Sequence, residues 1–222
     1  MKVNTDGVLL GAAMTLNGTE RNLLDVGTGT GVIALMAAQR LESTGAHEFT
    51  VCAIDIDSPS AEEASLNFRN SPWADHLEIS NTSLQAYEPD KDFDLIFSNP
   101  PYFDNSLENP DRRKTEARHT ESLSYREICS FSSNHLSEDG RLAIILPSEE
   151  KDKLFREGRS YGLFPCRLVL IRTTEKKKPR RIIAEFSRKR TGGIETTTLT
   201  IQKDGKYTDE YQELTGSFYI FL

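Results

Sequence analysis

The sequence is poor in the residues that build disulfide frameworks and metal centres. It has three widely spaced cysteines, Cys52, Cys129 and Cys166, and four scattered histidines. Neither a zinc-ligand spacing nor a disulfide framework fits this set. No apolar run approaches the ~20 residues that a membrane-spanning helix needs, and no signal peptide is recognisable. We therefore expect a cytoplasmic protein with reduced thiols, no metal and no membrane contact.

The chain also lacks a net positive charge, because 27 Lys and Arg face 34 Asp and Glu, which gives a formal net charge of −7. Residues 167–190 nevertheless carry ten Lys and Arg against two Glu. A basic cluster on an acidic domain can attract a phosphate backbone, although a solvated lysine-rich loop is the alternative. If a binding site for a base lies nearby, the cluster favours RNA as a partner.

A distinctive tetrapeptide, Asn99-Pro100-Pro101-Tyr102, follows an apolar run at 93–98 that predicts a buried strand. The two prolines fix the backbone and remove two N–H donors. The carbonyl oxygens and the Asn99 amide are therefore presented without competing donors, beside an aromatic ring. Such rigid acceptors suit a planar substrate that carries an NH2 group, whereas a strand ending in a proline turn is the structural alternative.

A glycine-rich turn separates a predicted strand at 22–26 from an apolar helix at 31–41. Gly27, Gly29 and Gly31 give the spacing G-x-G-x-G, without the third Gly or Ala of the dinucleotide fingerprint. No Lys-Ser/Thr follows, which excludes a phosphate-binding P-loop. Asp25, just before the turn, would repel a pyrophosphate but suits a cationic ligand. The turn, including Thr28, is a candidate site for a nucleotide-like ligand.

An acidic residue, Asp55, ends the next predicted strand, at 50–55. A carboxylate at this position accepts the ribose hydroxyls in doubly wound folds. Asp57-Ser58-Pro59 then predicts the start of a helix at 58–70. A role in the turn alone is the alternative for Asp55, but the order of strand, glycine turn, helix, strand and acid favours ribose binding.

Together these residues resemble the S-adenosylmethionine-dependent amino methyltransferases whose fourth strand ends in Asn-Pro-Pro-Tyr. The resemblance covers nearly all of residues 1–150. It implies that S-adenosylmethionine is bound and released as S-adenosylhomocysteine, with the glycine turn under its methionine part and Asp55 on its ribose. It also implies that the tetrapeptide 99–102 faces the acceptor nitrogen and is the catalytic element.

Residues 1–11 and 118–125 are further similar to bacterial tRNA adenine-N6 methyltransferases that modify the adenosine 3′ of the anticodon in valine tRNA. Related enzymes carry additional residues before Thr5-Asp6-Gly7, so we expect a truncated N-terminus. They also often have an Asp where Ser83 stands, so Ser83 would act through its hydroxyl or leave that contact to the backbone. The residues that the resemblance assigns to the cofactor are Thr5, Asp6, Gly7, Asp25, Gly27, Thr28, Gly29, Gly31, Asp55, Ile56, Ser83 and Asn99.

The order of predicted elements is that of one doubly wound, Rossmann-like α/β domain over residues 1–222. Strands at 22–26, 50–55, 77–80, 93–98 and 141–146 alternate with helices at 31–41, 58–70 and 122–136, after a short helix at 7–16. A helix at 148–157 precedes strands at 165–172 and 181–189. These strands complete a seven-stranded methyltransferase sheet, mostly parallel with a C-terminal antiparallel pair. We also expect a further strand at 195–202, a helix at 208–215 and a lid at 104–121.

The resemblance implies methyl transfer to the exocyclic N6 of an adenine in tRNA, which we expect a monomer to perform. Asn99 Oδ1 and the Pro100 carbonyl would each accept one amine hydrogen, which aims the nitrogen lone pair at the methyl group. Tyr102 would stack on a flipped-out base. The residues expected to contact RNA are Phe103, Arg118, His119, Lys176, Lys177, Lys178, Arg180 and Arg181.

Three alternatives stay open at this point. A glutamine side chain of a translation factor also presents an NH2 group, but enzymes of that class usually carry an N-terminal helical domain. DNA adenine methylation would need a target-recognition domain, and none is visible. A non-catalytic RNA-binding module with the same fold would have no need of Asn99, Pro100 and Tyr102.

Overall fold

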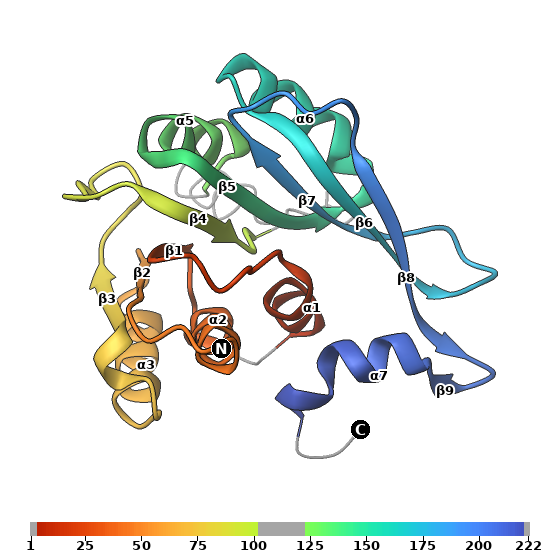
Figure 1. Cartoon of the computed structure of the whole chain (residues 1–222), viewed down its shortest axis with the longest axis horizontal. Coiled ribbons are helices and arrows are strands. Elements are labelled where there is room, and N and C mark those ends of the chain that lie inside the picture. The colour runs from red at the N-terminus through yellow and green to blue at the C-terminus, as the bar shows by residue number, and fades with distance from the viewer. Residues whose placement is uncertain (1–3, 102–122, 220–222) are drawn as a thin grey trace, which may run out of the picture.

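A single nine-stranded sheet forms the centre of the fold (Figure 1). The computed structural model describes residues 4–101 and 123–219. Tyr102, Phe103, Arg118, His119 and the lid predicted at 104–121 lie outside the described residues. The strands are β1 (Asn22–Val26), β2 (Thr50–Asp55), β3 (Leu77–Asn81), β4 (Phe93–Ser98), β5 (Leu136–Pro147), β6 (Phe164–Thr174), β7 (Arg181–Ser187), β8 (Glu195–Lys203) and β9 (Lys206–Tyr207).

Helices cover both faces of the sheet, with α1, α2, α3 and α7 on one side and α5 and α6 on the other (Figure 1). The α-helices are α1 (Thr5–Ala13), α2 (Val32–Ser43), α3 (Ser58–Arg69), α5 (Tyr125–His135), α6 (Lys151–Ser160) and α7 (Asp209–Thr215). Short 3₁₀ turns are η1 (Ala74–His76), η2 (Ser148–Glu150) and η3 (Gly216–Phe218). None of the described helices combines the length and the apolar character that a bilayer crossing requires.

The strand order β3-β2-β1-β4-β5-β7-β6-β8-β9 confirms the doubly wound α/β class. β1 to β5 pair in parallel, β7 lies antiparallel between β5 and β6, and β8 pairs in parallel with β6. Only β7 and β9 therefore run against the others. The predicted antiparallel pair at 165–172 and 181–189 is β6 and β7.

The predicted count of seven strands was too low. β8 is the strand expected at 195–202, and it joins the main sheet beside β6. β9 was missed because it has two residues. Its signal was the Asp204-Gly205 turn. φ is 50° at Asp204 and 78° at Gly205, and such positive φ angles at both residues are what a two-residue hairpin turn requires.

The central strands are buried on both sides because they lie between two helical layers. Leu23 and Leu24 are both fully buried, and as neighbours in β1 they enter different apolar clusters. The first cluster includes residues of α1, α2 and α7, and the second includes residues of α5 and α6. This double burial explains why each central strand has a continuous apolar sequence.

Several element boundaries differ from the prediction by a few residues, and two of them have a clear local cause. α1 begins at Thr5, two residues early, because the Asn4 side chain accepts a hydrogen bond from Gly7 N at 2.7 Å and caps the helix. β5 begins at Leu136 because Phe93 pairs with Leu136 and Leu95 already pairs with Arg141. Residues 138–140, which precede the strand predicted at 141–146, are thus an irregularity within a longer strand.

Candidate functional site

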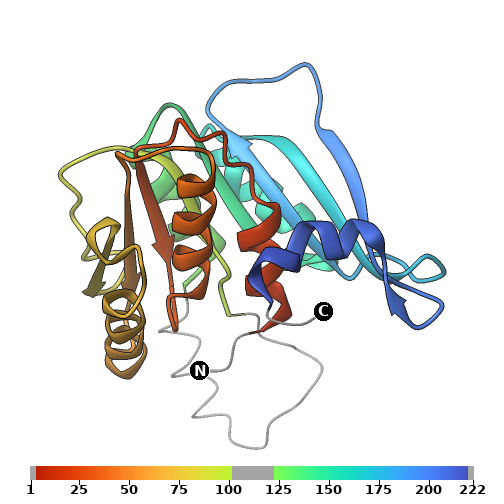
Figure 2. The same ribbon diagram turned by 60° about the horizontal axis from the view of Figure 1, so that its bottom comes forward.

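A cavity of about 500 Å³ opens where the parallel strands β1, β2 and β4 end. α1 begins at this same edge of the sheet (Figure 2). The carboxyl ends of parallel strands are where open α/β sheets bind ligands. The cavity wall combines the start of α1, the glycine turn, the ends of β2 and β3, and residues 99–101. Most of the predicted site residues in the described part of the chain therefore meet here.

The glycine turn holds its shape through bonds to β2. The backbone N–H groups of Gly27 and Thr28 both donate to the Ile54 carbonyl, at 2.9 and 3.1 Å. Gly27 and Gly29 have φ of 72° and 59°, a region that glycine adopts without strain. Both glycines and Thr28 line the cavity, so the turn presents backbone to a ligand without a Cβ in the way.

Asp55 lines the cavity and also fixes the turn. Its Oδ2 accepts a hydrogen bond from Gly29 N at 2.8 Å, and its Oδ1 accepts one from Asp57 N at 2.9 Å. The side chain is only 8% exposed. An ionised carboxylate has about four lone-pair directions, so both bonds leave acceptor capacity for a ligand. Asp55 therefore has the structural role weighed above, and the ribose role stays a prediction.

Three residues assigned to the cofactor do not line the cavity, and two of them, Asp25 and Gly31, are buried in the protein. Asp25 is fully buried, and its Oδ2 accepts a hydrogen bond from Thr28 Oγ1 at 2.7 Å. Burial raises the pKa of Asp25 from 3.8 to about 7. Gly31 is the N-terminal cap residue of α2, and a Cβ there would lie 2.4 Å from the Phe68 ring. Both residues support the turn from inside the protein.

Asn99 is held beside the start of α1. Ser98, fully buried, donates its hydroxyl to the Val26 carbonyl at 2.7 Å and so fastens the end of β4 to the end of β1. The next residue, Asn99, donates from Nδ2 to Asn4 Oδ1 at 3.4 Å. Asn4 Oδ1 is the same atom that caps α1. Asn99, Pro100 and Pro101 line the cavity beside Asn4.

Another part of the cavity wall comes from the residues that follow β2 and β3. Ile56 lines the cavity although 61% of it is exposed, which is unusual for a large apolar side chain. Ser83 also lines it, and its Oγ accepts a hydrogen bond from Ala86 N at 3.3 Å. An exposed apolar residue beside a polar turn suits one face and one edge of a planar ring.

The first turn of α1 contributes the remaining wall. Asp6 and Gly7 line the cavity, whereas Thr5 does not. Arg181, for which an RNA contact is predicted, donates from Nε to Asp6 Oδ2 at 2.8 Å. The other basic residues predicted to contact RNA that the structure describes, Lys176–Lys178 and Arg180, are exposed in the loop between β6 and β7.

The methyltransferase small domain family matches residues 3–153 of the chain. The tRNA1(Val) (adenine(37)-N6)-methyltransferase of Bacteroides thetaiotaomicron is 36% identical over 222 residues, which cover 100% of this chain and 92% of that protein. The protein of the same name from Parabacteroides distasonis is 39% identical over 223 residues, with coverage of 99% and 91%. The chain belongs to this tRNA methyltransferase family. The resemblance inferred from the motifs is thereby confirmed.

The fold of this methyltransferase family member also matches a solved structure. A predicted O-methyltransferase from Agrobacterium tumefaciens superposes with a TM-score of 0.70 at 16% identity, over 96% of both chains. At that identity the match shows the shared fold alone. The coverage means that the additional C-terminal strands, as well as the Rossmann-like part, lie within the matched portion.

Several cavity residues of this methyltransferase were not predicted. Asn4 had a detectable signal, because Asn before Thr-Asp-Gly is a typical helix cap. Gln85 follows Ser83 at the end of β3, and its Nε2 donates to Glu127 Oε1 at 2.6 Å. The others are apolar residues or short hydroxyl residues whose sequence positions carry no chemical signal: Val26, Thr30, Val32, Ile33, Ile54, Thr82, Leu84 and Leu123.

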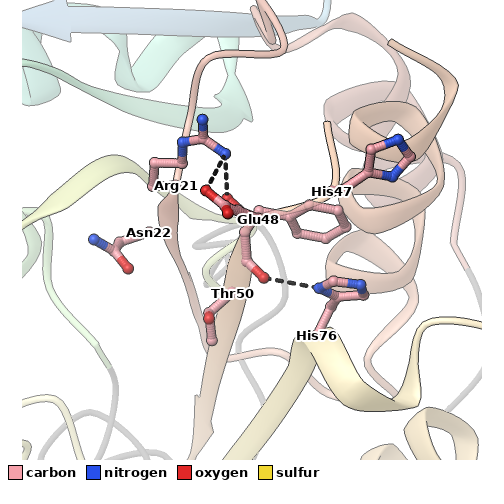
Figure 3. Close-up of a pocket in the computed structure, with 7 residues that line it drawn as sticks. Arg21, Asn22, His47, Glu48, Thr50 and His76 are labelled. Carbon is pink, nitrogen blue, oxygen red and sulfur yellow. Dashed lines mark hydrogen bonds and ion pairs between the residues drawn. The ribbon is translucent and has the colours of Figure 1, made fainter. Parts of the chain in front are cut away.

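A second depression, of about 420 Å³, lies at the opposite edge of the sheet, where β1 and β2 begin (Figure 3). Its polar groups make local bonds. Arg21 Nη1 donates to the Glu48 carbonyl at 2.8 Å, and His76 Nδ1 lies 2.9 Å from the Phe49 carbonyl oxygen. None of the predicted site residues lines it. Within residues 4–101 and 123–219, no group of three or more His, Cys, Asp or Glu is placed to hold a metal ion.

Proposed function

We propose that this protein transfers a methyl group from S-adenosylmethionine to N6 of an adenine in tRNA. The target we propose is the adenosine at position 37 of valine tRNA, which is named for the relatives. The observation that carries the proposal is the cavity itself, because one wall holds the glycine turn with Asp55 and another holds Asn99-Pro100-Pro101. A nucleoside cofactor and an amine substrate can therefore meet in one space.

The residues around the cavity fit S-adenosylmethionine. The backbone of Gly27 and Gly29 would lie against the methionine part, Asp55 would accept from the ribose, and Ile56 would pack on the adenine face. A volume of about 500 Å³ falls in the ordinary range of small-molecule pockets. When bound, S-adenosylmethionine supplies a methyl group on a positively charged sulfur. Asp6 and Asp55, both in the wall, favour that positive charge.

Asn99 and Pro100 would prepare the substrate amine. The lone pair of an adenine N6 is delocalised into the ring, so the free amine is a poor nucleophile. Asn99 Oδ1 and the Pro100 carbonyl would accept one hydrogen each and favour a pyramidal nitrogen. The bond from Asn99 Nδ2 to Asn4 Oδ1 sets the orientation of the Asn99 amide. This mechanism depends on positioning and electrostatics, and the methylated nitrogen then loses its proton to water.

Exposed basic residues at the same edge of the sheet as the cavity favour RNA over a protein substrate. Lys176, Lys177, Lys178 and Arg180 are all exposed in one loop. Phosphate contacts of this kind supply affinity without sequence specificity. A glutamine-methylating function would leave this loop without a purpose, and relatives over nearly the whole chain carry the tRNA name. We also propose that a monomer is active, which size-exclusion chromatography of the active fraction tests.

The test is methyl transfer from labelled S-adenosylmethionine to total tRNA from a strain that lacks the modification, with mass spectrometry of the nucleosides. We expect N6-methyladenosine, confined to valine tRNA. Asn99→Ala should abolish transfer while calorimetry shows S-adenosylmethionine binding largely retained. Label in a translation-factor glutamine and none in tRNA would replace the proposal with protein methylation. Binding of S-adenosylmethionine without transfer to either substrate would indicate a non-catalytic module.

A further inference from the structure

Two hairpins project from the same edge of the sheet as the cavity. One is the β6–β7 loop at 175–180, and the other is the β8–β9 turn at 204–205. β6 and β8 run in the same direction as β1 and β4, so their carboxyl ends lie at the edge where the cavity opens. In both ribbon views the two hairpins lie side by side (Figures 1 and 2). The second hairpin had no predicted function.

Side-chain bonds join the two hairpins. Arg172 on β6 donates from Nε to Thr200 Oγ1 on β8 at 2.8 Å, and from Nη1 to the Glu175 carbonyl at 3.1 Å. Lys203 Nζ lies 3.6 Å from Glu175 Oε1. The parallel β6–β8 ladder extends to the pair Thr174–Gln202. The hairpins are therefore held in one arrangement, which we call the two-hairpin platform (residues 172–181 and 202–207).

The platform is strongly positive although the protein is acidic overall. It carries eight Lys and Arg against two acids, in a chain of formal net charge −7. The acids are Glu175 and Asp204. Most of the positive side chains are exposed, since only Arg172 and Arg181 are half-buried. The basic residues are Arg172, Lys176, Lys177, Lys178, Arg180, Arg181, Lys203 and Lys206.

The platform also carries an exposed aromatic ring. Tyr207, next to Lys206 on β9, is 42% exposed, one of the few large apolar side chains to be so exposed. Its ring stacks on Tyr211 of α7, with centroids 4.9 Å apart and planes at 27°. Tyr211 is 3% exposed and therefore holds Tyr207 in place from below. Successive strand residues point to opposite faces, so Tyr207 and Lys206 present a ring and a cation on the two sides of the same hairpin. A rigid, exposed ring on a basic hairpin is a combination that binds unpaired bases of RNA.

The platform connects directly to the cavity wall. Arg181, at its inner end, is paired with Asp6, which lines the cavity. The backbone of an RNA whose target base lies in the cavity would thus run from this wall onto the platform.

We propose that the two-hairpin platform is a second RNA contact. In it, Lys206 binds a phosphate and Tyr207 stacks on an unpaired nucleotide other than the one that is methylated. The proposal rests on the proposed tRNA function and extends it beyond the predicted lysine loop. Phosphates increase affinity for any tRNA, whereas the ring needs a loop or a single strand. The platform therefore favours the unpaired anticodon loop over paired stems.

The test uses the full chain and an unmodified valine tRNA transcript, with binding followed by fluorescence anisotropy at several salt concentrations. Tyr207→Ala should weaken tRNA binding about tenfold. Tyr207→Phe keeps the ring and should therefore bind tRNA with wild-type affinity. Lys206→Glu should weaken binding about tenfold and reduce the salt dependence by about one phosphate contact. Lys91→Glu makes the same charge change near the start of β4, at the opposite edge, and should bind as wild type does.

Kinetics separate this platform from the catalytic site. We expect the KM for tRNA to rise in Tyr207→Ala and Lys206→Glu, while kcat at saturating tRNA and the Kd of S-adenosylmethionine stay unchanged. Affinity within twofold of wild type in both variants overturns the platform and leaves the proposed function standing. If wild type binds tRNA and methylates none, the proposed function fails and the same variants still decide the platform. If wild type binds no tRNA, both fail.

Discussion

Arg181 and Asp6 form an ion pair, with 2.8 Å between Nε and Oδ2, that joins residues 175 positions apart. Asp6 lies in the first turn of α1 and lines the cavity, whereas Arg181 begins β7 at the end of the basic loop. The guanidinium side chain is 37% exposed and the carboxylate 20%. The pair thus connects the surface predicted for RNA with the wall predicted for the cofactor.

Because of this pair, Arg181→Gln should raise the Kd of S-adenosylmethionine by about fivefold, the loss of roughly 1 kcal/mol that a partly exposed ion pair contributes. Calorimetry on the free enzyme measures this effect. Arg180→Gln is the matched control, because Arg180 is exposed in the same loop and should change tRNA affinity alone. If Arg181→Gln weakens tRNA binding and leaves the Kd of S-adenosylmethionine unchanged, Arg181 acts as the predicted RNA contact and does not support the cofactor wall.

Much of the catalytic end of the fold was predictable because its signals are local. The run before Asn99 is apolar since β4 is buried on both faces, and the turn at 27–31 needs glycine because φ is positive at three positions. The helix after Asp57 starts as predicted because the Asp57 side chain accepts from Ser60 N at 3.0 Å. Each of these signals lies within a few residues of the structure that it determines.

The rest depends on contacts that the sequence does not reveal. Asp25 precedes the glycine turn, as a cofactor ligand would, but its strand position directs it into the core and out of the cavity. Arg181 belongs to a basic run, yet its partner is Asp6, far away in the chain. β9, with two residues, is too short for any periodic pattern, so the Asp204-Gly205 turn alone indicated it.

Asn4 should affect both helix stability and methyl transfer, because its Oδ1 bonds Gly7 N and Asn99 Nδ2. Asn4→Asp keeps the acceptor and should retain both properties. Asn4→Ser keeps a cap with a shorter side chain, so we expect stability near wild type and a kcat about fivefold lower, the effect of one hydrogen bond. Single-turnover methyl transfer and urea unfolding measure the two properties. An unchanged kcat in Asn4→Ser would show that Asn99 needs no partner at Asn4.

Asp55 can be tested for its two roles separately. Asp55→Ala removes the acceptor of two backbone N–H groups, so the free energy of unfolding should fall by about 1–3 kcal/mol. Ribose binding predicts a second effect. Wild type should bind S-adenosylhomocysteine more tightly than an analogue without ribose hydroxyls, and Asp55→Ala should lose that preference. Calorimetry with both ligands decides, and a preference that survives in Asp55→Ala would assign the ribose elsewhere.

Ile56 offers a test of where the adenine lies. Its side chain is 61% exposed and lines the cavity, so a ligand bound in the cavity would cover it. Ile56→Ala should weaken S-adenosylhomocysteine binding about fivefold to tenfold while the melting temperature of the free enzyme stays the same. Leu66 on α3 is 52% exposed and does not line the cavity, so Leu66→Ala is the control. Equal affinities in the two variants would place the adenine away from Ile56.

Asp25 should make stability depend on pH in the neutral range. Burial raises the pKa of Asp25 from 3.8 in the unfolded chain to about 7 in the folded protein. Between these values the folded state binds more protons than the unfolded state, so this residue lowers the free energy of unfolding as the pH rises from about 4 to about 7. The decrease should reach at most about 1.4 kcal/mol per pH unit and stop once the folded protein has lost the proton.

Asp25→Asn removes this titration, so its free energy of unfolding should depend less on pH than that of wild type between about pH 5 and about pH 8. Urea unfolding across that range measures both slopes. Asp57→Asn is the control, because hydrogen bonds from Ser60 lower the pKa of exposed Asp57 and its contribution to stability is lost only in acid. If the free energy of unfolding changes with pH equally in wild type and Asp25→Asn, Asp25 stays ionised despite its burial, held by the hydrogen bond from Thr28.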